Sequence, residues 1–349
     1  MSLSALNPLG WKPCFELQLT SAEMDELMVV RIGAHFGSQV LYMTDGLELS
    51  VPTSLTESCG ELAVGDWLLV DPETHRGVRR LERESLIKRK AAGQRSQTQW
   101  IAANVDTLFI VSSCNHDFNL SRLERYLAVA NEACVNPVVV LTKSDLCDDP
   151  HSLQQQASRL MAGLLVEFID ARDSSQAASL AIWCGQGQTV GLVGSSGVGK
   201  STLATSLGAG PLETQPIRED DSKGRHTTTT RSIHRLDAGG VLIDTPGMRE
   251  LQLAECEQGV DEVFEEIVLL AQSCHFRDCK HQYEPGCAIQ DAIDQGRLDP
   301  RRLSSYRKLQ SEQARNTQSL REQRHQSRKR GRFFKSVLAE KRQRHGNDR

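Results

Sequence analysis

A phosphate-binding sequence in the middle of the chain limits its fold most strongly. The apolar run 189–193 is typical of a buried strand, and Gly194-Ser-Ser-Gly-Val-Gly-Lys-Ser201 follows it directly. This octapeptide matches G-x-x-x-x-G-K-[ST], in which glycines let successive backbone N–H groups face phosphate oxygens at the start of a helix. We expect Lys200 to neutralise the β- and γ-phosphates and the Ser201 hydroxyl to ligate Mg²⁺. The residues expected to bind a nucleoside triphosphate here are Gly194, Ser195, Ser196, Gly197, Val198, Gly199, Lys200, Ser201 and Thr202.

Short apolar runs alternate with helix-forming segments from residue 103 onward. The strands are expected at 105–111, 137–141, 164–169, 189–193 and 241–243, and the helices near 121–130, 151–163 and 174–183. Ser121 and Glu124 have the spacing of a capping box that opens the first of these helices. Such alternation predicts a parallel sheet with right-handed crossovers, and therefore an α/β doubly wound nucleotide-binding domain.

A guanine-reading motif is expected at Thr142-Lys143-Ser144-Asp145, directly after the strand at 137–141. Guanine presents two donors on one edge, and one carboxylate accepts both, whereas adenine offers no such pair. We therefore expect Asp145 to select guanine, while a Lys/Asp surface turn is the alternative. Thr142 departs from the asparagine that usually ties this motif to the P-loop. In the loop expected to back the base, after the strand at 164–169, only Ala171 matches well.

A second nucleotide-reading motif, Asp244-Thr-Pro-Gly247, ends the apolar strand downstream of the P-loop. In a D-x-x-G motif, Asp244 holds the Mg²⁺ shell and the Gly247 N–H senses the γ-phosphate. The order of the motifs is unusual, because the base-reading motif precedes both the P-loop and the D-x-x-G. The sequence thus predicts a circularly permuted GTPase domain.

The water-orienting residue is expected in the polar stretch 219–231, since Met248 follows the D-x-x-G where many GTPases place a glutamine. We expect His226 to orient water or donate to the γ-phosphate, and a solvated loop histidine is the alternative. Thr228 or Thr229 is expected to ligate Mg²⁺ through its hydroxyl. The expected catalytic set is therefore His226, Lys200 and Gly247.

A cluster of metal-ligand residues follows an amphipathic helix expected over 260–271. Its spacing is Cys-x4-Cys-x-His-x5-Cys, formed by Cys274, Cys279, His281 and Cys287. Four soft or borderline ligands suit a tetrahedral structural Zn²⁺ site with no open position. His275 is a competing ligand, and a metal-free reduced cluster is the alternative.

The N-terminal part differs in its pattern from the rest of the chain. Residues 1–27 show no clear period and are expected to form an irregular leader, and residues 91–99 are expected to be a linker. Five short β-rich runs within 28–90 predict a small OB-like barrel, with an SH3-like or purely structural barrel as the alternative.

The distribution of charge suggests a polyanionic partner. The net charge is −4, but residues 297–349 hold 17 lysines and arginines against 5 aspartates and glutamates. We expect 311–349 to be a basic tail, helical or disordered, that contacts phosphates, whereas a merely solvated helix is the alternative. Neither a signal sequence nor a membrane span is expected, and the 10 cysteines are expected to be reduced thiols or metal ligands, so the expected location is cytoplasmic.

With these motifs together, residues 28–310 resemble the ribosome small subunit-dependent GTPase A family. The resemblance depends on TKSD preceding GSSGVGKS, on GRHTTT, on DTPGMRE and on the cysteine and histidine spacing. It implies an OB-like barrel (28–90), a permuted GTPase domain (91–255) and an α-helical zinc domain (256–310). It also implies GTP hydrolysis to GDP in late maturation of the 30S subunit, stimulated by that subunit, with His226 assisting hydrolysis. The expected partners are the 30S subunit and its 16S rRNA, and the expected state is a monomer that binds no membrane.

Two other classes of protein fit parts of the pattern. A P-loop ATPase or kinase would make the Asp145 motif a coincidence. An RNA-binding scaffold would keep a nucleotide site that no longer turns over. Replacing Asp145 by asparagine should change the nucleotide preference of a GTPase but not that of a P-loop ATPase or kinase. Replacing Lys200 by alanine should remove phosphate release from a GTPase, whereas a scaffold has no such activity to lose.

Overall fold

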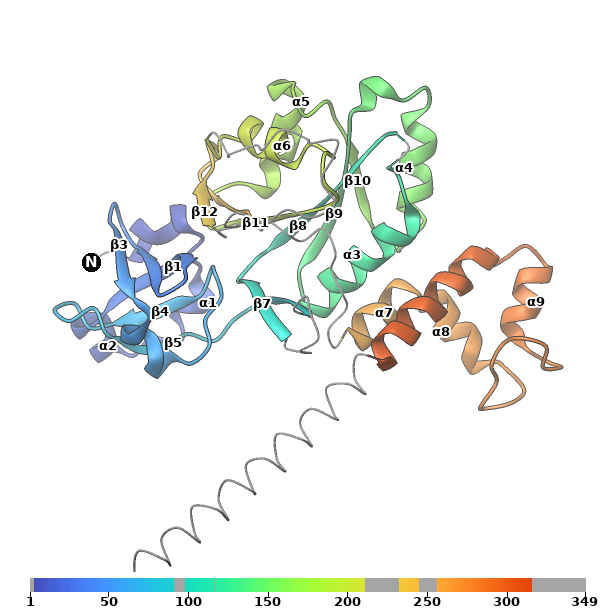
Figure 1. Cartoon of the computed structure of the whole chain (residues 1–349), viewed down its shortest axis with the longest axis horizontal. Helices are drawn as coiled ribbons and strands as arrows, with labels where there is room; N and C mark the ends of the chain where they lie inside the picture. Colours follow the sequence, from blue (N-terminus) through green and yellow to red (C-terminus); the bar gives the residue numbers. More distant parts are fainter. Residues whose placement is uncertain (1–2, 91–97, 116, 211–231, 245–255, 316–349) are drawn as a thin grey trace, which may run out of the picture.

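One large sheet runs from the N-terminal region through the nucleotide-binding domain (Figure 1). The computed structural model describes residues 3–90, 98–115, 117–210, 232–244 and 256–315. Within them the sheet has 11 strands, and the order along its main path is β10-β9-β8-β11-β13-β12-β1-β2-β3. The sheet therefore joins two domains that the sequence pattern separates.

The nucleotide-binding half of the sheet is parallel. It consists of β8 (Thr107–Ser113), β9 (Asn136–Thr142), β10 (Leu165–Phe168), β11 (Thr189–Val193) and β13 (Val241–Asp244), with β12 (Ser232–Arg235) antiparallel beside β13. The five parallel strands lie at the positions expected from the apolar runs, whereas the antiparallel β12 was not expected. Because the carboxyl ends of parallel strands meet at one edge, the last residues of β9, β11 and β13 lie at the same edge of the sheet.

Helices cover both faces of this half of the sheet. On one face lie α3 (Leu120–Glu132) and α4 (Pro150–Ser158), and on the other α5 (Ser174–Ala177), η4 (Ala178–Trp183) and α6 (Lys200–Ser206). The short helix η3 (Ser144–Leu146) directly follows β9. Successive side chains of β8 point to opposite faces: Leu108 packs in the core under α3 and α4, and Phe109 packs in the core under α5, η4 and α6. The doubly wound architecture is thereby confirmed.

The start of α3 differs from the expected capping box. The N-cap is Asn119, whose side chain accepts a hydrogen bond from the Arg122 backbone N–H at 3.1 Å. Ser121 lies inside the helix, and its hydroxyl contacts that of Ser305 at 2.9 Å. Asparagine and serine are both preferred N-cap residues, so the residue type does not decide between Asn119 and Ser121. The packing of the helix decides it.

The N-terminal β region has its own small core. Its strands are β1 (Met28–Phe36), β2 (Gln39–Met43), β3 (Glu48–Pro52), β4 (Trp67–Val70) and β5 (Gly77–Arg80), close to the five expected runs. The helix η2 (Thr53–Cys59) contacts both β3 and β5. Strand β1 also pairs with β12 of the nucleotide-binding half, with Ala34 opposite Ser232. This pairing carries the sheet from one domain into the other.

The leader is not irregular, contrary to expectation. It forms η1 (Leu3–Leu9), α1 (Pro13–Glu16) and α2 (Ser21–Glu26). Trp11 and Phe15 pack against Trp67 of β4, with ring centroids 4.9 and 6.0 Å away. Helices this short have too few turns to show a hydrophobic period, so the sequence pattern does not reveal them.

The expected linker is partly a strand. β6 (Leu86–Lys90) pairs antiparallel with β7 (Thr98–Ala103), so residues 98–99 belong to β7, while 91–97 lie outside the described residues. The expectation was wrong for these two residues because the partner strand β6 supplies their hydrogen bonds.

The C-terminal part is helical. The helix expected over 260–271 is divided at Phe264 into α7 (Glu257–Val263) and α8 (Glu265–Gln272), and α9 (Ala288–Asp294) follows. A further helix covers 300–315, and the rest of the expected basic tail, 316–349, lies outside the described residues. α7 packs on α3, which joins this part to the nucleotide-binding domain. In the described part of the chain, every helix is too short or too polar to span a bilayer.

Candidate nucleotide and metal sites

The P-loop connects the buried strand β11 to α6. Gly194, Gly197 and Gly199 have φ of 145°, 74° and 99°, values that favour glycine. A Cβ on Gly194 would lie 2.1 Å from the Val111 carbonyl oxygen, so this position also requires glycine for space. The Lys200 ammonium donates to the carbonyl oxygens of Gly194 and Ser195 at 2.8 and 2.5 Å. The expected strand, loop and helix are all present.

The guanine-reading motif is tied to the P-loop at two points. Thr142, fully buried at the end of β9, donates its hydroxyl to the Val198 carbonyl oxygen at 2.5 Å. Lys143, in the left-handed region at φ 57°, donates to the Gly197 carbonyl oxygen at 2.7 Å. Threonine in place of the commoner asparagine therefore keeps a side-chain tie between the two loops.

Asp145 lies at the expected edge, in η3, and it is paired. Arg172 donates to Asp145 at 2.9 Å and to Asp170 at 2.8 Å. The hydrogen bond from Arg172 lowers the pKa of Asp170. The base-backing loop is held in turn by Ser206 of α6, whose hydroxyl donates to the Ala171 carbonyl oxygen at 2.6 Å. Sequence reasoning missed Arg172 and Ser206, because their partners are 27 and 35 residues away.

Asp244 ends β13 at the same edge of the sheet as the P-loop. It lies opposite Ser232 of β12, and Ser232 lies opposite Ala34 of the N-terminal β region. The strand pairing thus forms a direct lateral path from Asp244 to the neighbouring domain. Four further candidates, His226, Thr228, Thr229 and Gly247, lie outside the described residues, as does Met248.

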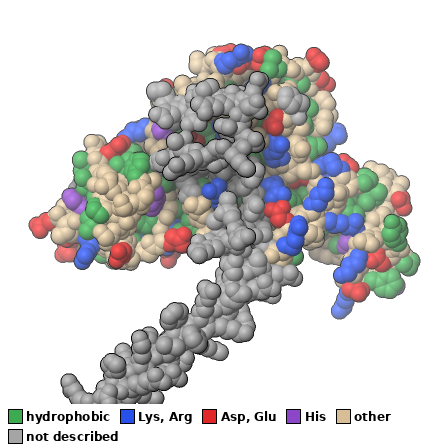
Figure 2. Space-filling model, in the orientation of Figure 1, with side chains coloured by type: hydrophobic (Ala, Val, Ile, Leu, Met, Phe, Trp, Pro, Cys, Tyr) green, Lys and Arg blue, Asp and Glu red, His purple; other side chains and the backbone are tan. Residues whose placement is uncertain are grey.

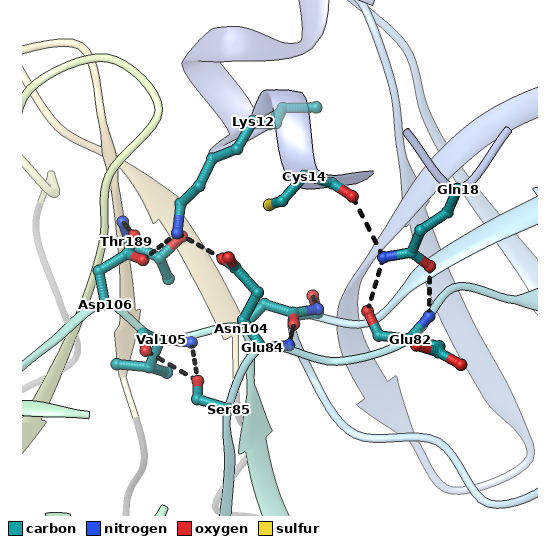
Figure 3. Close-up of polar contacts among 12 residues, drawn as sticks. Lys12, Cys14, Gln18, Glu82, Glu84, Ser85, Asn104, Val105, Asp106 and Thr189 are labelled. Atoms are coloured by element: carbon teal, nitrogen blue, oxygen red, sulfur yellow. Dashed lines mark hydrogen bonds and ion pairs between the residues drawn. The ribbon is translucent and has the colours of Figure 1, made fainter. Parts of the chain in front are cut away.

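The other end of the P-loop strand is anchored by polar contacts (Figure 3). The Thr189 N–H donates to Asp106 at 2.7 Å. Lys12 of the leader donates to the other oxygen of Asp106 and, at 2.6 Å, to Glu84. Arg31 of β1, fully buried, donates to the Thr189 hydroxyl at 3.0 Å. These partners fix β11 at its first residue, opposite the end that carries the P-loop.

Three cysteines and one histidine gather in the C-terminal part as expected. The ligand atoms of Cys274, Cys279, His281 and Cys287 all lie within 4.8 Å of one another. His281 Nδ1 is 3.5 Å from Cys274 Sγ and 3.6 Å from Cys287 Sγ. Zinc bonds of about 2.0 to 2.3 Å in a tetrahedron require ligand separations of this size. The donor set therefore fits a structural zinc ion.

The backbone around the cluster is held by side chains that are not ligands. The His281 carbonyl oxygen accepts from Gln290 at 2.5 Å and from Arg307 at 2.8 Å. Glu284 accepts from backbone N–H groups at 280, 282 and 283, which lowers its pKa to about 2. The competing ligand His275 is outside the four-residue group, and its ring packs on Phe276.

Comparisons with known proteins agree with this geometry. The RsgA GTPase family matches residues 80–254. A small ribosomal subunit biogenesis GTPase RsgA 2 of Vibrio parahaemolyticus is 51% identical, over 98% of this chain and 96% of the relative. The RsgA of Mesorhizobium japonicum is 48% identical, over 90% and 92%.

Two solved structures share the fold. YjeQ from Thermotoga maritima has a TM-score of 0.58 at 22% identity, covering 81% of this chain and 97% of that one. YloQ, described as a circularly permuted GTPase, has a TM-score of 0.57 at 21% identity, covering 82% and 94%. The permuted order of motifs therefore has a counterpart of known structure.

Proposed function

Because this chain belongs to the RsgA GTPase family and is a GTP hydrolase, we propose that it acts in late maturation of the small ribosomal subunit. The observation that carries the proposal is the permuted site itself, in which Thr142 and Lys143 tie the guanine motif to the P-loop. Relatives that match almost the whole chain are named as biogenesis GTPases of that subunit. The chain is proposed to work as a monomer in the cytoplasm.

The residues proposed to bind GTP and GDP fall into two groups. Asp145 is proposed to accept the two donors on the guanine edge, in place of the hydrogen bond that it accepts from Arg172 in this structure. The P-loop from Gly194 to Thr202 surrounds the phosphates, with Lys200 supplying positive charge. This division assigns specificity to Asp145 and phosphate affinity to Lys200.

Ser201 and Asp244 are proposed to hold Mg²⁺, together with Thr228 or Thr229. Their hydroxyl and carboxylate oxygens are the ligands that this cation prefers. When bound, Mg²⁺ neutralises charge on the phosphates. Gly247 is proposed to donate its N–H to the γ-phosphate, and His226 is proposed to orient the attacking water. His226 is the residue whose replacement should lower turnover while leaving GDP affinity intact.

The C-terminal part is proposed to bind 16S rRNA of the 30S subunit. The set Cys274, Cys279, His281 and Cys287 is proposed to hold one structural Zn²⁺. Beside it, Arg125, Arg307, Lys308 and Arg315 line a groove of about 700 Å³. Figure 2 shows Lys and Arg side chains where the nucleotide-binding domain meets these helices. Phosphates are the natural partner of such a basic groove.

Phosphate release from GTP tests the proposal, measured with and without purified 30S subunits and in excess ATP. We expect turnover that 30S subunits stimulate and that ATP does not suppress. GTP-selective turnover indifferent to 30S subunits would contradict the ribosomal partner. Turnover lost to ATP would contradict selection of guanine and favour the ATPase class.

A further inference from the structure

We propose that Arg122 is a positioning residue for GTP hydrolysis, which holds Ser195 of the P-loop and, through it, the catalytic ammonium of Lys200. The proposal rests on the phosphate-binding role proposed above for the P-loop. Arg122 lies in the first turn of α3, 73 residues from Ser195 in sequence. It is outside every nucleotide-binding motif that the sequence analysis identified.

The contact joins the side chain of Arg122 to the P-loop. Arg122 Nη1 donates to the Ser195 hydroxyl oxygen and, at 2.7 Å, to the carboxylate of Asp117. Asp117 precedes α3 and orients the guanidinium, because a carboxylate and an arginine form a strong charge-assisted bond. The Arg122 side chain is 37% exposed, so it is not a freely solvated group.

Ser195 is held from two sides. Its hydroxyl accepts from Arg122, and its carbonyl oxygen accepts from the Lys200 ammonium at 2.5 Å. The neighbouring Gly194 and Gly197 have positive φ and no side chains, so the loop has little stiffness of its own. The hydrogen bond from Arg122 on α3 therefore restricts the positions of Ser195 and of the Lys200 ammonium. Charged groups that are already in place before the reaction contribute strongly to stabilising the transition state.

The helix that carries Arg122 is itself firmly packed. Glu124 is fully buried and accepts from Arg301 at 2.9 Å and Arg302 at 2.8 Å. Arg125 forms two bonds with Glu312, at 2.6 and 2.7 Å. The backbone of α3 is thus fixed by the C-terminal helix at 300–315. Because α3 is held in this way, the hydrogen bond from Arg122 restricts the movement of the P-loop.

Arg79 of β5 provides a matched control for Arg122. Both arginines pair with a carboxylate, Glu23 for Arg79 and Asp117 for Arg122, and both side chains are 37% exposed. Arg79 bonds Glu23 and the Gln18 carbonyl oxygen in the N-terminal part of the chain. Loss of an ion pair should affect the stability of both variants, whereas loss of positioning should affect the kcat/KM of R122A alone.

The experiment measures kcat, KM, GDP affinity and Tm for the full chain and for R122A, S195A, R122A/S195A, R122K and R79A. We expect R122A and S195A each to lower kcat/KM for GTP about tenfold, the size of one charge-assisted hydrogen bond. The double variant should be no worse than either single one, because both remove the same contact. R122K should recover part of the loss, and R79A should keep the wild-type kcat/KM.

Two results would overturn the proposal. One is an R122A variant with the kcat/KM of R79A, and the other is losses in R122A and S195A that multiply in the double variant. K200A serves as the reference for the underlying site. If K200A hydrolyses GTP normally, the phosphate site and the positioning role are both wrong. If K200A is inactive while R122A is normal, only the positioning role is wrong.

Discussion

The hydroxyl of Thr189, the first residue of the P-loop strand, accepts a hydrogen bond of 3.0 Å from the buried guanidinium of Arg31 in β1. The same guanidinium donates to the carbonyl oxygens of Leu9, Gly65 and Asn104. Burial lowers the pKa of Arg31 only to about 10, so the side chain stays charged at neutral pH. One residue thereby links the leader, the N-terminal β region and the nucleotide-binding domain.

Replacing Arg31 by methionine should lower the free energy of unfolding by about 3 kcal/mol, because four buried acceptors each lose a hydrogen bond. Urea unfolding of the full chain measures the change. Arg235→Met, at an exposed position of β12, is the control and should change little. Equal losses in the two variants would contradict the linking role of Arg31.

Replacing Asp145 by asparagine should move nucleotide preference from GTP toward XTP, since an amide presents a donor where the carboxylate presents an acceptor. We expect the KM for GTP to rise about a hundredfold. Asp148→Asn, exposed and three residues further along, is the control and should leave the preference unchanged. An Asp145→Asn variant that keeps its preference for GTP would remove Asp145 from the guanine site.

Removing His281 should abolish stoichiometric zinc, whereas removing His275 should not. The reason is geometric, because only His281 lies with the three cysteines. Metal content of His281→Ala and His275→Ala, purified without chelator, measures the difference. The expected values are far below one zinc per chain for the first variant and near one for the second. The reverse pattern would make His275 the ligand.

Replacing Glu124 by glutamine should destabilise the joint between α3 and the C-terminal helix by about 3 kcal/mol, because Arg301 and Arg302 lose the buried carboxylate that they share. Arg301 keeps Asp299 and Arg302 keeps Glu266, so we expect the lower end of the range for a broken buried pair. Protease cleavage within the C-terminal part, followed over time, reports local opening. Glu262→Gln, an exposed change on α7, is the control. Unchanged cleavage in Glu124→Gln would show that the buried ion pairs do not hold this joint.

Acid should weaken the tie between α2 and β5. The hydrogen bond from Arg79 lowers the pKa of Glu23 from 4.5 to about 2. A carboxylate with a lowered folded-state pKa adds stability that is complete above pH 4.5 and disappears as pH falls toward 2. Thermal melts from pH 5 to about 2 should show a steeper loss for wild type than for Glu23→Gln. Parallel curves for the two proteins would contradict this assignment.

The parts that the sequence reveals are those whose chemistry is local. The P-loop, the guanine motif and the Cys-x4-Cys-x-His-x5-Cys spacing each fit within 15 residues, so their residue types and spacing carry the prediction. Long strands and helices can also be predicted, because their apolar residues recur with a regular period. Short elements and exact boundaries depend on packing, so the sequence did not reveal the leader helices, the N-cap at Asn119 or the division at Phe264.

The sequence by itself determined the class of chemistry, the permuted order of the motifs and which three cysteines and one histidine gather in the C-terminal part. Only the tertiary structure decided that Thr142 reaches Val198, that Arg122 reaches Ser195 and that Arg31 reaches Thr189. These pairs are separated by 56, 73 and 158 residues. The physical reason is that a buried donor must find an acceptor, but which acceptor it finds depends on how the whole sheet and its helices pack.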